Sequence, residues 1–282
     1  MRIKNLLYWL LVILLSVTMV ISGYMVFRYL ADSAQQKKEY DTLAELVEQA
    51  RSDAASEVPP ATTPQIPDDA SSAHEVPEDA SPAEAEGTSI LPEYAPLYEK
   101  NSDLVGWMTI DGTPINYPVM QTPDRVDYYL HRSFEKKENS HGCLYVRESC
   151  DVFAPSDNVT IYGHHMKDGS MFAGLDHFLS QSYWEEHQTV RFDTLYEHHD
   201  YTIFAVFTTT ASMFEGFAYH QFENAEFQED FDEFIATCKD LSHYDTGITP
   251  QYGDKIICLS TCEYSDVNGR LVVAAVRNTE TP

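Results

Sequence analysis

The chain has 282 residues, enough for one sizeable domain with accessory segments, and its 43% of hydrophobic residues can supply a substantial core. Its formal net charge of −27 at pH 7 argues against nucleic acid as a partner. Nucleic-acid binding depends on Lys and Arg side chains that neutralise phosphates, and this chain is dominated by acidic ones.

The N-terminal region is the only long apolar run in the sequence. Residues Leu6 to Phe27 form an uncharged stretch of 22 residues. As a helix it would be about 33 Å long at ~1.5 Å per residue, which spans a hydrocarbon core of ~30 Å. A cleaved signal peptide is the alternative, but its apolar region is normally only ~7–15 residues long. We expect an uncleaved, single-pass membrane anchor within residues 1–30. Arg2 and Lys4 before the run favour a cytoplasmic N-terminus, and Arg28, Lys37 and Lys38 after it reduce this charge bias.

Residues 31–88 are predicted to hold a polar helix and a linker. The helix covers residues 36–53, and its apolar side chains recur at helical spacing: Tyr40, Leu43, Leu46 and Val47. Residues 54–88 contain six Pro, eight Ala and eight Asp or Glu, without Lys, Arg or aromatic residues. Such a composition buries too little apolar surface to fold, so we interpret it as an extended tether. Residues 89–282 then form the globular domain.

The globular part reads as mostly β. Asp111-Gly112 is a hairpin signal between two short apolar segments. Eight short strands with turns between them indicate a closed barrel or a sandwich. The predicted strands are Val105–Ile110, Ile115–Met120, Gly142–Arg147, Val159–Gly163, Thr189–Thr194, Tyr201–Thr210, Lys255–Cys262 and Arg270–Asn278.

Two helices are predicted between the strands. The first covers Ser170–Gln181. The second covers Ala225–Asp240, with Asn224 as its N-cap. Its apolar stripe is interpreted as core packing, not as a cofactor site; the stripe consists of Phe227, Phe231, Phe234, Ile235 and Cys238.

The five cysteines do not form a recognisable disulfide framework, because their number is odd. Cys258 and Cys262 lie about 13 Å apart if they share a strand at ~3.3 Å per residue, and a disulfide needs Cα atoms within about 7 Å. Cys143 and Cys150 have the spacing to pair, but two buried thiols are the favoured interpretation.

Cys262 and Arg270 are the first pair of residues that suggests chemistry. Cys262 ends a predicted strand, Asn268-Gly269 marks a turn, and Arg270 begins the return strand. If the strands pair, the guanidinium lies near the thiol. There it favours a thiolate and stabilises the oxyanion that forms when the thiolate attacks a carbonyl. Taken alone the signal is weak, since a strand-end Cys beside an Arg is more often incidental.

His164 and His165 emerge at the end of another predicted strand, directly after Gly163. An imidazole at such a position can act as acid and base near neutral pH. Judged alone, however, surface imidazoles or one half-buried His are the commoner explanation.

Together these segments resemble the sortase family. Sortases carry, in this chain order, a Gly-His at a strand end, a Thr-Leu-x-Thr-Cys-like strand end and an Arg on the next strand. Class B is indicated by the Tyr162–Phe172 run, by the Trp107–Met120 run and by Tyr128-Tyr129-Leu130. The resemblance covers roughly residues 94 to 278. It implies a closed eight-stranded sortase-type β-barrel with inserted helices, in which Cys262, His164 and Arg270 are catalytic.

The resemblance also implies an activity. Sortases are membrane-bound transpeptidases of Gram-positive bacteria, and their catalytic domain is extracellular. The enzyme cleaves a substrate protein after Thr in a C-terminal sorting motif, holds it as a thioacyl intermediate on the Cys, and transfers it to a cell-wall or pilin amine such as that of a peptidoglycan precursor. No cofactor and no metal are implied.

Substrate contacts are predicted at Ser260, Leu130 and Thr261. Ser260 lies two residues before Cys262, so strand alternation places both on one face. One position departs from the family pattern. Class B enzymes often carry an Asn a few residues before the Tyr-Tyr-Leu run, whereas Val126 and Asp127 stand there in this chain.

Three rival interpretations are weighed against this one. A papain-like cysteine peptidase would place its Cys before its His, the reverse of the order here. A zinc site built from His164, His165 and Cys262 lacks a recurring ligand spacing. A tethered adhesin or pilus subunit would end in a sorting motif, an apolar run and basic residues, which the last residues, Val276–Pro282, do not show.

Overall fold

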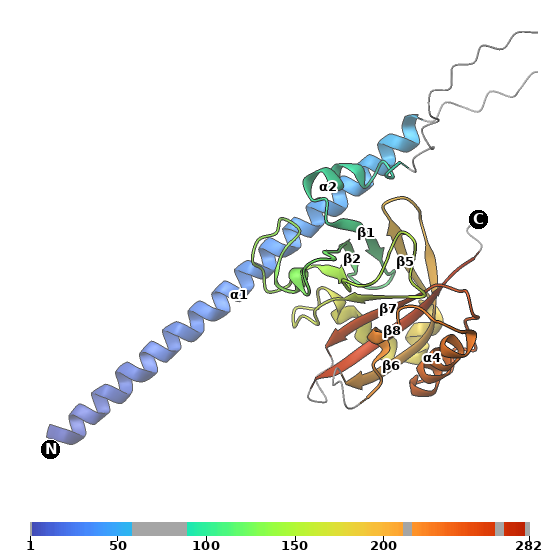
Figure 1. The fold of residues 1–282 in the computed structure, drawn as a ribbon. Coiled ribbons are helices and arrows are strands. Elements are labelled where there is room, and N and C mark those ends of the chain that lie inside the picture. The colour runs from blue at the N-terminus through green and yellow to red at the C-terminus, as the bar shows by residue number, and fades with distance from the viewer. Residues whose placement is uncertain (1, 58–88, 211–215, 263–267, 280–282) are drawn as a thin grey trace, which may run out of the picture.

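The computed structural model describes residues 2–57, 89–210, 216–262 and 268–279. Its centre is a closed barrel of eight strands in the order β1-β2-β3-β4-β7-β8-β6-β5 (Figure 1). The predicted barrel is thereby confirmed, and every predicted strand is present within two residues of its expected bounds. The strands are β1 Leu104–Thr109, β2 Asn116–Met120, β3 Leu144–Val146, β4 Asn158–Tyr162, β5 Thr189–Thr194, β6 Asp200–Thr210, β7 Ile256–Cys262 and β8 Gly269–Arg277.

Strand alternation divides the barrel into an inner and an outer apolar face. On β7, Ile257 and Leu259 pack into the larger core cluster, whereas Ile256 and Cys258 belong to a second cluster. This second cluster lies under helix α4 (Gln228–Leu241), which covers the barrel on the side away from α1 (Figure 1). Ser260 and Cys262 continue the α4-facing side of β7, because residues two apart on a strand share a face.

The start of α4 differs from the prediction. The helix begins at Gln228, and the carboxylate of Asp230 accepts a hydrogen bond of 2.9 Å from the Phe227 backbone N–H. Asn224 is not its cap; its side-chain oxygen accepts a hydrogen bond of 3.1 Å from the Asp157 backbone N–H. Phe227 precedes the helix and is 60% exposed, while the other four residues of the predicted stripe are buried.

The predicted helix at residues 170–181 is two shorter elements. A 3-10 helix, η2, spans Phe172–Leu179 and is followed by α3, Gln181–Glu186. Ser180 between them has extended backbone angles, so the helical hydrogen-bond ladder is interrupted there. The remaining short elements are α2 (Ala95–Lys100), η1 (Tyr128–His131) and η3 (Tyr219–Gln221).

The N-terminal region is one continuous helix, α1, from Arg2 to Glu57, instead of an anchor and a separate polar helix. It is long and apolar enough to cross a membrane. Its C-terminal part runs alongside the barrel while its N-terminal part projects away from it (Figure 1). The docked part buries Tyr40, Leu43 and Val47 in the core cluster of the barrel. The predicted linker at residues 54–88 falls largely outside the described residues.

The cysteines agree with the sequence-based interpretation. All five thiols are free, and Cys143 and Cys150 are both buried. Cys262 is the one cysteine with partial exposure. A thiol available for chemistry is therefore found at the end of β7.

Candidate active site

A groove of about 430 Å³ opens where β4 and β7 end and β8 begins, and it brings together the three residues predicted to be catalytic. Cys262 comes from the end of β7, Arg270 from the start of β8, and His164 from the loop after β4. The residues around the groove come from segments far apart in the chain, as predicted. They are Val126, Asp127, Leu130, His131, Tyr145, Arg147, Glu148, Tyr162, Gly163, His164, Tyr219, His220, Ser260, Thr261, Cys262 and Arg270.

Cys262 and Arg270 are directly opposite each other in the antiparallel β7–β8 pair. Opposite residues in such a pair project from the same face, with Cβ atoms about 4.5–5.5 Å apart. Arg270 donates a hydrogen bond of 2.9 Å from Nη1 to the carbonyl oxygen of Gly269 and is half-buried. The register thus sets Cys262 opposite a residue that carries a permanent positive charge.

His164 is oriented by a hydrogen bond to the backbone. Its Nε2 lies 2.7 Å from the carbonyl oxygen of Leu130. A carbonyl only accepts hydrogen bonds, so Nε2 carries a proton and Nδ1 is the nitrogen that titrates. The residue before it is Gly163, where an added Cβ would lie 2.5 Å from Leu144 and 2.6 Å from Phe172. The chain therefore enters the site through a position that only glycine fits.

The surroundings of His164 favour its neutral form. Burial lowers the pKa of His164 below its ordinary value, and nearby His131 and His141 lower the pKa further, while the hydrogen bond to Leu130 opposes the shift. The His131 ring stacks on that of His164, with ring centres 5.3 Å apart and an angle of 24° between the planes. An imidazolium at His164 is therefore costly, and forms most readily when a negative charge develops nearby.

The three predicted substrate contacts all line the groove. The Ser260 hydroxyl is hydrogen-bonded to the Tyr219 hydroxyl at 2.5 Å. The Thr261 hydroxyl is buried and has no hydrogen-bond partner among the described residues. Leu130 contributes its backbone carbonyl, which orients His164. Their contact with a substrate stays a prediction.

Several residues of the groove were not found from the sequence. Tyr219 and His220 lie in η3, a short turn whose sequence has no periodic pattern. Tyr162 and His131 carried a usable signal, because each is near a residue that was identified: Tyr162 shares the strand that leads to His164, and His131 directly follows Leu130.

His165 does not line the groove. Its Nε2 lies 2.7 Å from an oxygen of Asp176, and its side chain is 18% exposed. The two adjacent imidazoles thus have different surroundings, as strand geometry predicts. Within the described residues there is no group of three or more His, Cys, Asp or Glu side chains arranged to hold a metal ion.

Comparison with known proteins adds independent evidence. A family model described as the sortase domain matches residues 108–278. Sortase B of Staphylococcus aureus is 32% identical over 188 residues, which cover 66% of this chain and 75% of that protein. Sortase B of Listeria monocytogenes is 34% identical over 185 residues, covering 64% of this chain and 72% of that one.

Solved structures agree with the sequence matches. Sortase B of Clostridium perfringens aligns with a TM-score of 0.60 at 28% identity, over 65% of this chain and 98% of that one. A Staphylococcus aureus sortase B–substrate complex aligns with a TM-score of 0.71, over 89% of this chain and all of that one. At 24% identity the second comparison supports the fold alone.

Proposed function

Because the chain belongs to the sortase family and to its sortase B group, we propose that it is a cysteine transpeptidase with Cys262, His164 and Arg270 as its catalytic residues. The observation that carries the proposal is the shared groove, which is lined by a partly exposed thiol, an imidazole and a guanidinium from three strand ends. The substrate is a protein with a sorting motif near its C-terminus.

In the first half-reaction the Cys262 thiolate attacks the carbonyl carbon after Thr in the motif. The electron pair of the carbonyl moves onto oxygen, and Arg270 stabilises that oxyanion. As the carbonyl re-forms, the carbon–nitrogen bond breaks and the departing amine takes a proton from the imidazolium of His164. The N-terminal part of the substrate remains as a thioester on Cys262.

In the second half-reaction an amine of the cell wall or of a pilin attacks the thioester. His164, now neutral, accepts a proton from this amine, and the carbon–sulfur bond breaks to return the Cys262 thiolate. A new amide joins the substrate to the acceptor. The enzyme regains its starting charge state, and the steps balance without a cofactor.

We also propose that this chemistry takes place at a membrane. We assign the N-terminus to the cytoplasm and the barrel to the outside, because the candidate acceptors are extracellular and α1 has the length and hydropathy of a membrane span. Access of an externally added protease to the segment between α1 and α2 tests this orientation.

The activity can be tested with the full chain in detergent and fluorogenic peptides. Peptides based on Asn-Pro-x-Thr and on Ser/Pro-Pro-x-Thr are compared, with and without a small amine acceptor. The full chain should cleave at least one of them and form a new amide with the acceptor. Cys262→Ala should lower kcat by at least about a thousandfold, because the covalent route is lost.

Cys150→Ala is the matched control, because it removes a thiol that does not line the groove. Its activity should stay within about twofold of the wild type. An active Cys262→Ala enzyme would refute the proposal. Cleavage that never yields an amide with any acceptor would instead favour a cysteine peptidase, the second function that this groove supports.

A further inference from the structure

The loop that carries His164 is tied at its tip to the anchor helix. The loop is a short hairpin: the His164 carbonyl accepts a hydrogen bond of 2.9 Å from the Phe172 backbone N–H, and His165 bridges to Met171. Asp168 lies at the tip, where its Oδ1 accepts hydrogen bonds from the backbone N–H and the hydroxyl of Ser170, at 3.0 and 2.6 Å. One carboxylate oxygen of Asp168 is thereby used within the loop.

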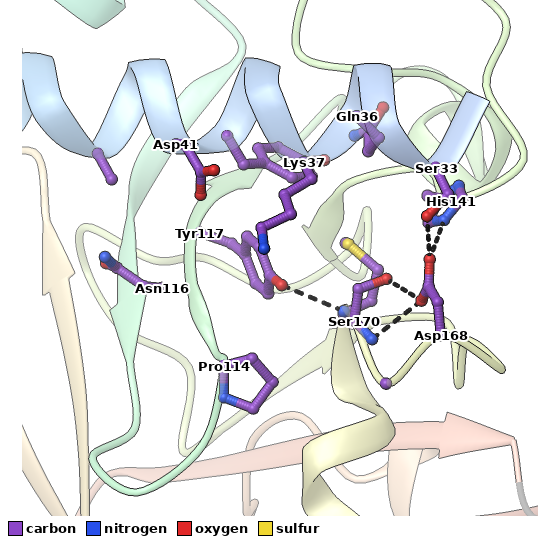
Figure 2. Close-up of a pocket in the computed structure, with 14 residues that line it drawn as sticks. Ser33, Gln36, Lys37, Asp41, Pro114, Asn116, Tyr117, His141, Asp168 and Ser170 are labelled. Carbon is purple, nitrogen blue, oxygen red and sulfur yellow. Dashed lines mark hydrogen bonds and ion pairs between the residues drawn. The ribbon is translucent and has the colours of Figure 1, made fainter. Parts of the chain in front are cut away.

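The other carboxylate oxygen of Asp168 has its hydrogen-bond partners outside the loop. Oδ2 accepts a hydrogen bond of 2.5 Å from Ser33 of α1 and lies 3.0 Å from Nε2 of His141. Figure 2 shows Ser33 and His141 converging on Asp168, beside a cavity of about 320 Å³ between α1 and the barrel. Burial alone would raise the pKa of Asp168, but the hydrogen bonds from Ser170, Ser33 and His141 outweigh it and hold the pKa well below its usual range. Asp168 is thus a charged junction of two loops and a helix.

The second loop at this junction, residues 139–142, packs against η1, the element that carries the hydrogen-bond acceptor of His164. Directly after the loop, the Cys143 N–H donates a hydrogen bond of 3.0 Å to the Tyr129 carbonyl of η1. Gly142 packs so closely on η1 that a Cβ there would lie 2.4 Å from the Leu130 carbonyl oxygen. That oxygen is the one that accepts from His164. A displacement of this loop would therefore displace the acceptor of the catalytic imidazole.

The same face of α1 holds this second loop. The Tyr40 hydroxyl donates a hydrogen bond of 2.7 Å to the Gly142 carbonyl. Gln36 accepts a hydrogen bond from the Asn139 side chain, and Asn139 in turn accepts from the His141 backbone N–H at 2.7 Å. Ser33, Gln36 and Tyr40 follow one another at spacings of three and four residues, so they share one helix face.

We propose that α1 from Ser33 to Tyr40 is part of the active-site scaffold, and that Asp168 is a positioning residue that couples this part of the anchor helix to His164. The inference rests on the proposed function. Full activity then requires the docked helix, and the segment that leaves the membrane also orders the catalytic loop. A misplacement of about 1 Å at a reacting group can cost up to about a hundredfold in rate.

The test uses the full chain in detergent and a motif peptide that the wild-type enzyme cleaves. Asp168→Ala should lower kcat about ten- to a hundredfold while KM changes less than about twofold, because the substrate groove does not include Asp168. Ser33→Ala and Tyr40→Phe should lower kcat in the same sense by smaller factors. The Ser33→Ala and Asp168→Ala effects should be non-additive, since both break one contact.

Glu197→Gln is the matched control, because it alters another carboxylate–histidine pair, Glu197 with His199, away from both loops. It should leave kcat and KM unchanged. Equal kcat values for wild type and Asp168→Ala would overturn the inference while the proposed function stands. A rise in the KM of Asp168→Ala as large as the fall in its kcat would also overturn the inference. So would a loss of activity that is fully explained by a loss of folded protein, as measured in a thermal melt. An inactive wild-type enzyme would instead refute the proposed function.

Discussion

At the scale of single residues, the stacked pair His131 and His164 has the most direct consequence for activity. Both rings line the groove, and a positive charge on one disfavours a positive charge on the other. The proposed reaction needs an imidazolium at His164 together with a thiolate at Cys262. The surroundings of His164 instead favour its neutral form, so the fraction of molecules with the charge state that the proposed reaction needs is sensitive to neighbouring charge.

A substitution of His131 tests this coupling. The pKa of His164 is lowered from 6.5 by burial first and by His131 among the further causes. The limb of the kcat/KM profile that reports the titration of His164 should therefore have its midpoint below pH 6.5 in the wild type. His131→Asn removes one source of positive charge, so the pKa of His164 rises and the midpoint should move to higher pH, measured with a motif peptide between pH 4.5 and 9.

The control for this prediction is His177→Asn. His177 is exposed on η2, its ring packs at a tilt against that of Tyr183, and it does not line the groove. Its profile should coincide with that of the wild type. A midpoint that stays in place, or moves to lower pH, in His131→Asn would contradict the electrostatic coupling.

Residue identity could be predicted from the sequence where a side chain carries the chemistry. Cys262, His164 and Arg270 are distinctive residues at predicted strand ends, and Cys262 and Arg270, which are only eight positions apart in the sequence, pair with each other in the β7–β8 register. The carbonyl of Leu130 could not be predicted as the acceptor of His164, because every residue has a carbonyl. Asp168 was equally hidden, since its partners lie 27 and 135 residues away in the chain.

At the scale of elements, α4 shows how a hydrophobic pattern can be right about a face and wrong about an end. Phe231 is fully buried between α4 and the outer face of the barrel, whereas Phe227 is 60% exposed. Both were assigned to one stripe because they are four residues apart, which is the helical repeat. The stripe fails at Phe227 because the helix has not yet begun there, and its first turn is fixed by the Asp230 carboxylate.

The two phenylalanines provide a matched pair for a stability measurement. Phe231→Ala should lower the free energy of unfolding by about 3–5 kcal/mol, because it leaves a cavity in a packed cluster. Phe227→Ala should change it by less than about 0.5 kcal/mol, as expected for an exposed side chain. Urea unfolding of the full chain in detergent, followed by near-UV circular dichroism, gives both values. Similar losses in the two variants would contradict this description of α4.

At the scale of the whole molecule, the long helix α1, which is apolar enough to cross a membrane, is packed on the barrel. Its docked face continues to Arg51, whose Nε lies 3.3 Å from Glu93 and whose Nη2 lies 3.5 Å from Asp193. Both carboxylates are buried, with 6% and 2% of their side chains exposed. The Tyr94 hydroxyl also donates to Asp193 at 2.6 Å. Arg51 precedes residues 58–88 and Glu93 follows them, so the two flanks of this segment are held together.

This docking could not be predicted from the sequence. The spacing of Tyr40, Leu43 and Val47 indicated an apolar helix face. The predicted linker between this helix and the globular domain is long, so the sequence does not indicate which surface the face packs against. The tether was expected to let the domain reach away from the membrane. If α1 crosses a membrane, this docking itself sets the height of the barrel above it. Gln36, the first fully buried residue among the α1 side chains that the structure describes, lies nine residues beyond Phe27, about 14 Å at ~1.5 Å per residue.

A protease site introduced within residues 58–88 tests both the docking and the orientation. The chain is displayed on bacterial cells without their cell wall, and the protease is added outside. Cleavage should occur, and the barrel should stay with the cells after the cut, because three buried apolar side chains at about 1.5–3 kcal/mol each and the Arg51 ion pairs hold it on α1. The double variant Leu43→Ala with Arg51→Ala should release the barrel into the supernatant after the same cut. Thr42→Ala, on the exposed side of the helix, should not release it.

A wild-type barrel that is released at once would show that the linker alone joins it to the membrane. A chain that the external protease never cuts, although the detergent-solubilised chain is cut, would reverse the assigned orientation.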